Sequence, residues 1–149
     1  MASRTEVGIN DMPAVAAALE SARTIAVVGC SPHSYRPSHS IARYLISAGY
    51  EVLPVNPGHR ELLGRTCYRS LEEIPPGAID IVDVFRRSEH VAGIADQVLR
   101  RGGVGMVFLQ DGVVDTAAAR RLADAGIVVA MDRCIYRDRE SLRRGYPLE

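Results

Sequence analysis

Hydrophobic positions fall into two alternating patterns along the chain. Short, continuous apolar runs rich in β-branched residues, such as TIAVVG and DIVDVF, lack the in-and-out alternation of a half-exposed strand. Such runs are typical of strands that are buried on both faces. The predicted strands are 24–29, 51–55, 80–85, 105–110 and 127–131.

Between these runs, apolar residues recur at helical spacing and are bounded by start and stop signals. Asn10 or Asp11 can cap a helix over 12–22, and Ser88 and Asp115 can cap two later ones. Glycines close the helical patterns, as Gly49 does for 38–48. The two later helices are predicted to end at Gly102 and Gly126.

Two segments depart from this alternation. Residues 56–79 are irregular, with a short strand expected at 64–68 and a capped turn at 70–74. Pro54 inside a strand places that strand near a sheet margin, because proline gives no ladder donor. The charged tail 136–149 is expected to be loosely attached.

Strands that alternate with amphipathic helices predict an α/β fold, a three-layer Rossmann-like open parallel β-sheet with helices on both faces. The chain of 149 residues suits a single domain, 1–149, with its core at about 10–135. Ligands of such sheets bind at the carboxyl ends of the strands. That rule selects the segments 29–39, 56–60, 85–88 and 110–114.

The turn after the first strand, GCSPHSYRPSHS, has the position of a phosphate-binding loop. Gly29 lets the chain turn at once, Ser38 or Ser40 can cap the next helix, and a helix N-terminus attracts phosphate. Arg36 or Arg43 could add a guanidinium. The alternative is a plain strand–helix connection with surface arginines.

The amino-acid sequence of this turn argues against NAD binding. A dinucleotide site has G-x-G-x-x-G, and here no second or third glycine follows Gly29. The second strand ends in neutral Asn56 rather than in an acid that would hold ribose hydroxyls. The sequence therefore favours an adenine nucleotide with a phosphate on or near its ribose. His59 and Arg60 could contact that phosphate.

Composition and charge exclude several other classes of protein. Net charge is zero, 47% of residues are hydrophobic, and no basic excess supports nucleic-acid binding. No apolar run reaches the length of a membrane helix. The three scattered cysteines fit neither a disulfide framework nor a metal site, so a reducing cytoplasm is expected. Cys30 is a small core residue or a reactive thiol.

The chain resembles the stand-alone CoA-binding domain family, which is similar to the CoA-binding domain of the succinyl-CoA synthetase alpha subunit. The resemblance runs from about Thr24 to Cys134. It rests on VVGCSPHSYRPSHSIARYL, GYEVLPVNP, GRTCYRSLEEIP, DIVDVFRRSE, FLQDGVV and VVAMDRC, in that order. It implies coenzyme A or an acyl-CoA laid across the strand ends.

The resemblance also implies where the phosphates bind. Gly29, Cys30 and Ser31 would form the pyrophosphate turn. Arg36 and Ser38 would contact phosphate. The synthetase's phosphohistidine belongs to another domain, so no catalytic residue is assigned here.

The rest of the ligand follows the other strand ends in the same way. Asn56 and Pro57 would border the adenosine, and Phe85 and Arg86 would flank the adenine or the start of the pantetheine.

Near the thiol arm the resemblance places Gln110 and Gly112. Many relatives have no acid between these positions, whereas Asp111 here would bring a negative charge near the ligand path.

These observations favour a non-catalytic or regulatory CoA-binding protein. The alternatives are a nucleotide-dependent enzyme, for acyl transfer or NAD(P)-dependent oxidoreduction, that uses Cys30 or Cys134, and an interaction module that forms a homodimer or binds a partner protein.

Overall fold

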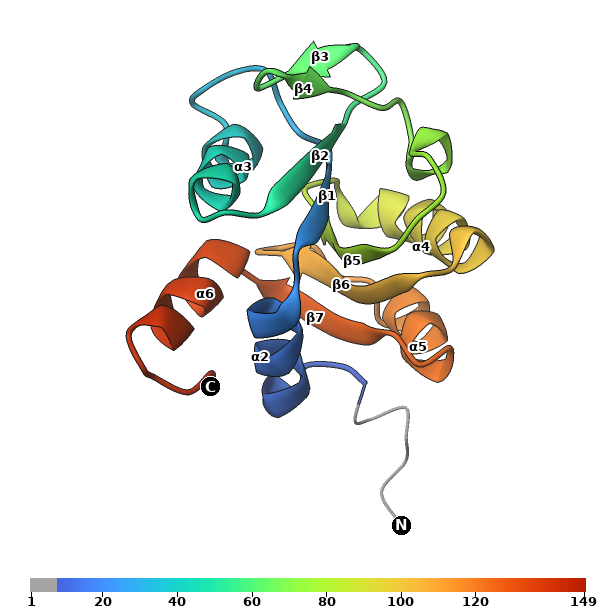
Figure 1. Cartoon of the computed structure of the whole chain (residues 1–149). Helices are drawn as coiled ribbons and strands as arrows, with labels where there is room; N and C mark the ends of the chain where they lie inside the picture. The colour runs from blue at the N-terminus through green and yellow to red at the C-terminus, as the bar shows by residue number, and fades with distance from the viewer. Residues whose placement is uncertain (1–7) are drawn as a thin grey trace.

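A computed structural model describes residues 8–149 and shows one twisted parallel sheet with helices on both faces (Figure 1). The strand order is β2-β1-β5-β6-β7, and every pairing is parallel. The predicted α/β, Rossmann-like class is confirmed. The strands are β1 (Thr24–Val28), β2 (Glu51–Val55), β5 (Ile79–Val84), β6 (Val104–Gln110) and β7 (Val128–Arg133).

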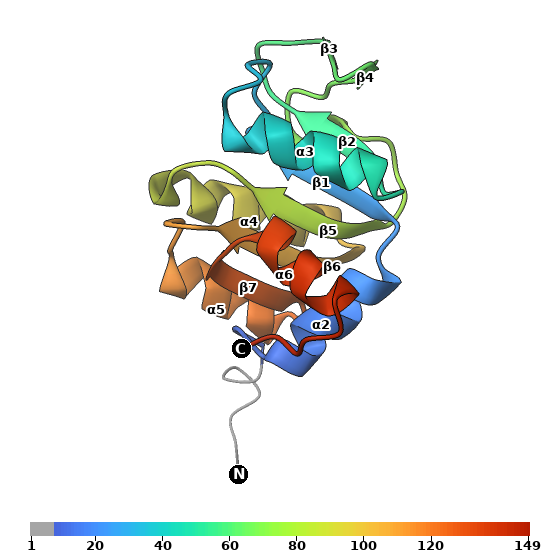
Figure 2. The ribbon, with the colours of Figure 1, turned by 90° about the vertical axis from the view of Figure 1, so that its left-hand side faces the viewer.

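Two helical layers bury the two faces of this sheet. Helices α2, α3 and α6 cover one face, and α4 and α5 cover the other (Figures 1 and 2). Each layer has its own apolar cluster, one around Phe108 and Leu45 and the other around Val82 and Leu122. The helices are α2 (Met12–Ser21), α3 (Pro37–Ser47), α4 (Val91–Arg101), α5 (Thr116–Asp124) and α6 (Ile135–Arg143).

The chain order reverses at β1, which lies between β2 and β5. After β1 the chain goes to the edge strand β2 and then crosses back to β5 on the other side. Pro54 therefore lies in an edge strand, as its missing amide hydrogen predicted. A reversal of this kind leaves a crevice between the carboxyl ends of the two neighbouring strands, which are called their exits below.

The irregular segment after β2 carries a small hairpin outside the main sheet. Strands β3 (Glu61–Leu62) and β4 (Arg65–Thr66) pair antiparallel, and a short 3-10 helix, η1 (Leu71–Glu73), follows. The expected strand at 64–68 is thus present only as β4, while Tyr68 bridges back to Val55.

The predicted side-chain caps at Asp11 and Asp115 are confirmed. Asp11 accepts a hydrogen bond from Ala14 N, and Asp115 accepts one from Ala118 N at 3.0 Å. The prediction for Ser88 is wrong, because α4 begins only after a 3-10 turn, η2 (Ser88–His90). The Ser88 hydroxyl instead accepts from Val114 N at 2.8 Å, so it ties the β5 exit to the β6 exit.

The expectation of a loose tail is wrong for α6. Ile135 is fully buried, and α6 packs against α2 and α3. Arg139 donates to the hydroxyls of Tyr44 at 2.8 Å and Tyr50 at 3.2 Å and lies over both rings. Arg139 in the tail thus makes specific tertiary contacts rather than lying on a solvated surface.

One acid is buried inside the sheet without a partner. Asp83, in β5, has no exposed surface, and neither of its carboxylate oxygens accepts a hydrogen bond from any residue in 8–149. Its neighbours in register are Val27 and Phe108. Burial raises the pKa of Asp83 well above its ordinary value, because the charged form is poorly solvated.

This shift predicts a pH dependence of stability. The unfolded chain ionises Asp83 above about pH 4, whereas the folded protein keeps it protonated, so its contribution to the free energy of unfolding falls as pH rises. Asp83→Asn cannot titrate. We therefore expect the variant to gain stability relative to wild type between about pH 5 and pH 8, measured by urea denaturation. A difference that stays constant with pH would show that Asp83 ionises normally.

Candidate functional site

The exits of β1 and β5 touch directly at Gly29. Gly29 has φ +84°, and a Cβ added there would lie 2.8 Å from Phe85 O and 2.9 Å from the Arg86 side chain. The amides of Gly29 and Cys30 both donate to Val55 O, at 3.0 and 3.3 Å. Only glycine fits this turn, since it needs both the left-handed conformation and the close approach.

The loop that follows is held in place by its own side chains. Ser31 N donates to Ser38 Oγ at 3.0 Å, His33 N donates to Ser31 Oγ at 3.0 Å, and His39 Nδ1 lies 2.9 Å from Ser31 O. These bonds give the loop a defined shape before any ligand binds.

The expected serine cap of α3 is wrong. Arg36 is the N-cap residue, without a side-chain bond, and Pro37 begins the helix. The amides of His39 and Ser40 donate to Arg36 O, whereas Ser38 N donates to no residue that the structure describes. The N-terminus of α3 therefore offers fewer free amides than its position predicted. Arginine guanidinium groups are then the more important candidate ligands for a phosphate.

A cavity of about 760 Å³ lies at the exits of β1, β5, β6 and β7. Most of the residues that the sequence predicted to bind a cofactor line this cavity. Those that line it are Gly29, Ser31, Arg36, Ser38, Phe85, Arg86, Gln110 and Gly112.

The other three predicted residues lie elsewhere. Cys30 is fully buried in the core, and burial raises the pKa of its thiol to about 12. Asn56 braces the turn, because its Nδ2 donates to Cys30 O and its Oδ1 accepts from Gly58 N, both at 2.8 Å. Pro57 lines a second cavity. Only the Cys30 backbone can therefore contribute to the turn.

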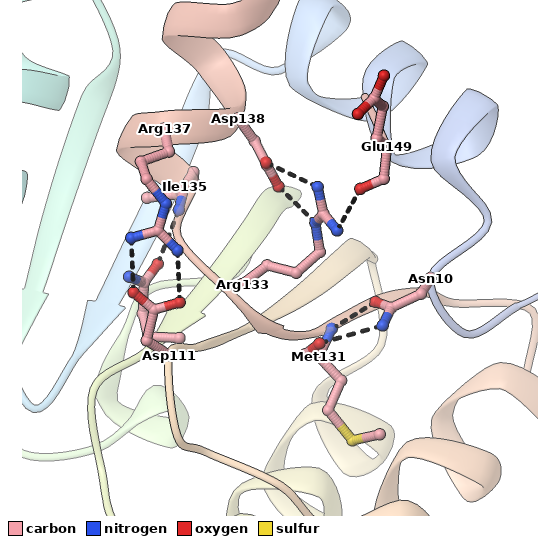
Figure 3. A network of polar contacts seen from close by, with 9 residues as sticks. Asn10, Asp111, Met131, Arg133, Ile135, Arg137, Asp138 and Glu149 are labelled. Atoms are coloured by element: carbon pink, nitrogen blue, oxygen red, sulfur yellow. Dashed lines mark hydrogen bonds and ion pairs between the residues drawn. The ribbon is translucent and has the colours of Figure 1, made fainter. Parts of the chain in front are cut away.

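The main cavity is rich in positive charge. Arg36 and Arg86 form no ion pair within residues 8–149, and Arg87 reaches Glu89 only at 4.0 Å on the surface. Asp111 also lines the cavity, but Arg137 donates to both of its oxygens, at 2.7 and 2.8 Å (Figure 3). These bonds lower the pKa of Asp111 and compensate its charge, so the acid leaves the cavity's positive character intact.

Sequence reasoning assigned no cofactor contact to the last strand and helix. Cys134 and Arg137 line the cavity from the β7 exit and α6, beside Val113, while Ile41 lines it from α3. Arg133 donates to both oxygens of Asp138 in the first turn of α6, and Figure 3 shows this pair next to the Arg137–Asp111 pair. The motif VVAMDRC was the available signal, because it ends a buried strand.

The second cavity, of about 450 Å³, lies beyond the β2 exit. His59, Arg60 and Arg69 line it together with Pro57. Its one acid, Glu73, accepts from Arg69 N at 3.1 Å. A basic pocket thus lies on the side of the edge strand.

Other kinds of site are not seen in residues 8–149. No three His, Cys, Asp or Glu side chains there gather in a way that could hold a metal ion. None of the helices in that range has the length and apolar character needed to cross a membrane.

The model of a CoA-binding domain family matches residues 23–140. This chain belongs to the CoA-binding domain family. The matched range covers the whole sheet and ends within α6, so it includes the first part of the helix that was expected to be loose.

Relatives of this CoA-binding domain agree with that assignment. The uncharacterized protein YneT of Bacillus subtilis (strain 168) is 43% identical over 117 residues, which is 78% of this chain and 85% of YneT. A solved structure of a hypothetical protein from Pyrococcus horikoshii OT3 superposes with a TM-score of 0.83 at 31% identity, covering 96% of this chain and 99% of that one. An acetate–CoA ligase (ADP-forming) of Archaeoglobus fulgidus is 29% identical over 90 residues, 60% of this chain but 13% of the ligase.

Proposed function

We propose that this protein binds coenzyme A or an acyl-CoA across the carboxyl ends of its parallel strands, in a non-catalytic or regulatory capacity. The observation that carries the proposal is the main cavity, where Gly29 brings two strand exits into contact. The guanidinium groups of Arg36 and Arg86 in this cavity have no acidic partner among residues 8–149. Membership of the CoA-binding domain family and the likeness to an acetate–CoA ligase support the same ligand.

The diphosphate lies at the β1 exit in this proposal. Arg36 and Arg86 flank the Gly29–Ser31 turn and offer planar donors to phosphate oxygens. Arg43, on the same helix, is exposed and does not line the cavity, so it takes no part.

The adenosine extends from there toward β2. Asn56 gives the turn a neutral side chain where NAD sites carry an acid, and Pro57 borders the second cavity. The basic side chains of that cavity, His59, Arg60 and Arg69, suit a phosphate on the ribose. The pantetheine then runs over β5 and β6 toward Gln110 and Gly112.

Titration calorimetry tests the ligand and its phosphate contacts together. CoA should bind more tightly than dephospho-CoA, and both more tightly than NAD. Arg36→Ala should weaken CoA binding by about 1.5–3 kcal/mol, the contribution of a hydrogen bond to a charged group. Arg43→Ala, the matched control, should bind as wild type does.

Each result bears on a different part of the proposal. Equal affinities for CoA and dephospho-CoA would remove the ribose-phosphate contact. NAD as the tightest ligand would overturn the proposed function. Unchanged CoA affinity in Arg36→Ala would move the diphosphate away from this loop.

A further inference from the structure

The three cysteines differ sharply in their access to the main cavity. Cys30 is fully buried, and Cys67 lies in the second cavity, where burial raises the pKa of its thiol. Cys134 has the same 7% exposure as Cys67, but it lines the main cavity. Only this thiol is placed to meet a group that lies in the main cavity.

A second residue beside Cys134 presents a polar group to the same cavity. Gln110 is 5% exposed and lines the same cavity. Its Oε1 accepts from Ile135 N at 3.2 Å, but its Nε2 donates to no residue in 8–149. This leaves an amide donor at the cavity without an acceptor among the described residues, and the pantetheine arm carries amide carbonyls that can accept from it.

The width of the sheet sets where the end of a pantetheine arm falls. β1 and β7 are separated by β5 and β6, so three strand spacings of about 4.8 Å give roughly 14 Å between their exits. That span is comparable to an extended pantetheine arm. With the diphosphate at the β1 exit, the sulfur of the arm reaches the β7 exit, where Cys134 lies.

Cys134 lies at the positive end of a helix. Cys134 is the N-cap residue of the nine-residue helix α6, so its side chain lies at the positive end of that helix. Arg137 lines the same cavity. The pKa of Arg137 is raised mainly by its hydrogen bonds to Asp111, and the nearby Cys134 adds to this. Cysteines at helix N-termini are among those that react in disulfide exchange.

We propose that Cys134 forms a mixed disulfide with coenzyme A, an inference that rests on the CoA-binding function proposed above. The Cys134 thiolate attacks one sulfur of a bound CoA disulfide. The Cys134–S–S–CoA bond forms, the disulfide bond of the incoming molecule breaks, and the departing CoA thiolate takes up the proton that Cys134 released. The CoA disulfide is itself the oxidant.

Non-reducing mass spectrometry of the intact protein tests the proposal. CoA disulfide at micromolar concentration should add one CoA unit about tenfold or more faster than glutathione disulfide adds one glutathione, because binding raises the effective concentration of the sulfur. Peptide mapping of the wild-type protein should place the adduct on Cys134. Cys134→Ser and Cys134→Ala should form no adduct, and Cys67→Ser should react as wild type does.

Adduct on Cys30 or Cys67, or equal rates with glutathione disulfide at Cys134, would overturn the inference. Calorimetry with reduced CoA separates it from the proposed function. Tight binding of CoA without an adduct at Cys134 would refute the mixed disulfide alone. Absence of any CoA binding would refute the proposed function as well.

Discussion

Gly29→Ala should abolish detectable CoA binding and lower the free energy of unfolding by about 3 kcal/mol. The left-handed backbone disfavours any side chain at φ +84°, and the new Cβ would overlap Phe85 O, a backbone atom that cannot rotate away. Relief of the overlap requires the β1 and β5 exits to separate, which widens the turn that holds the diphosphate in our proposal. Calorimetry with CoA and urea denaturation measure the two effects.

Gly126→Ala is the matched control for this substitution. Gly126 has φ +86°, but a Cβ there would meet no atom within 4 Å, and the residue ends α5 away from the cavity. It should lose about 1–2 kcal/mol for the backbone conformation and bind CoA normally. The importance of the β1–β5 contact would be refuted if the two variants lost equal stability, or if Gly29→Ala bound CoA as tightly as wild type.

Arg101→Ala should lower the free energy of unfolding by about 3 kcal/mol, because charge-assisted hydrogen bonds to partly buried carbonyls are lost. The Arg101 guanidinium donates to Leu71 O at 3.0 Å, Ile74 O at 2.7 Å, Pro75 O at 2.5 Å and Gly77 O at 3.3 Å. It thus anchors the segment between η1 and β5, which has little regular structure of its own. Urea denaturation of the wild type and the variant measures this difference in the free energy of unfolding.

The neighbouring Arg100 provides the comparison for this prediction. Its side chain is 61% exposed and pairs with Glu72 at 2.9 Å. Surface pairs of this kind contribute about 0–1 kcal/mol, so Arg100→Ala should be nearly neutral. Similar losses in the two variants would mean that the carbonyl contacts of Arg101 do not stabilise the fold.

The sequence predicted local features well and their assembly less well. Asp11 and Asp115 cap their helices as expected, because an N-cap depends on residues three positions away. Ser38 and Ser88 have the same chemistry, yet tertiary partners take their hydroxyls: Ser31 N in one case and Val114 N in the other. The segment around Arg139 looked like a solvated tail, because the tyrosines that hold it lie far away in the chain.

The order of apolar runs and helical stripes alone determined an α/β chain with a tight turn at Gly29, since periodicity and backbone conformation are local properties. Only the tertiary structure decided that Cys134 and Arg137 share a cavity with that turn, while the Cys30 side chain is shut inside the core. The physical reason is that strand order, not chain order, brings loop ends together. The β7 exit meets the β1 exit across two intervening strands, and a pattern along the chain does not contain that neighbourhood.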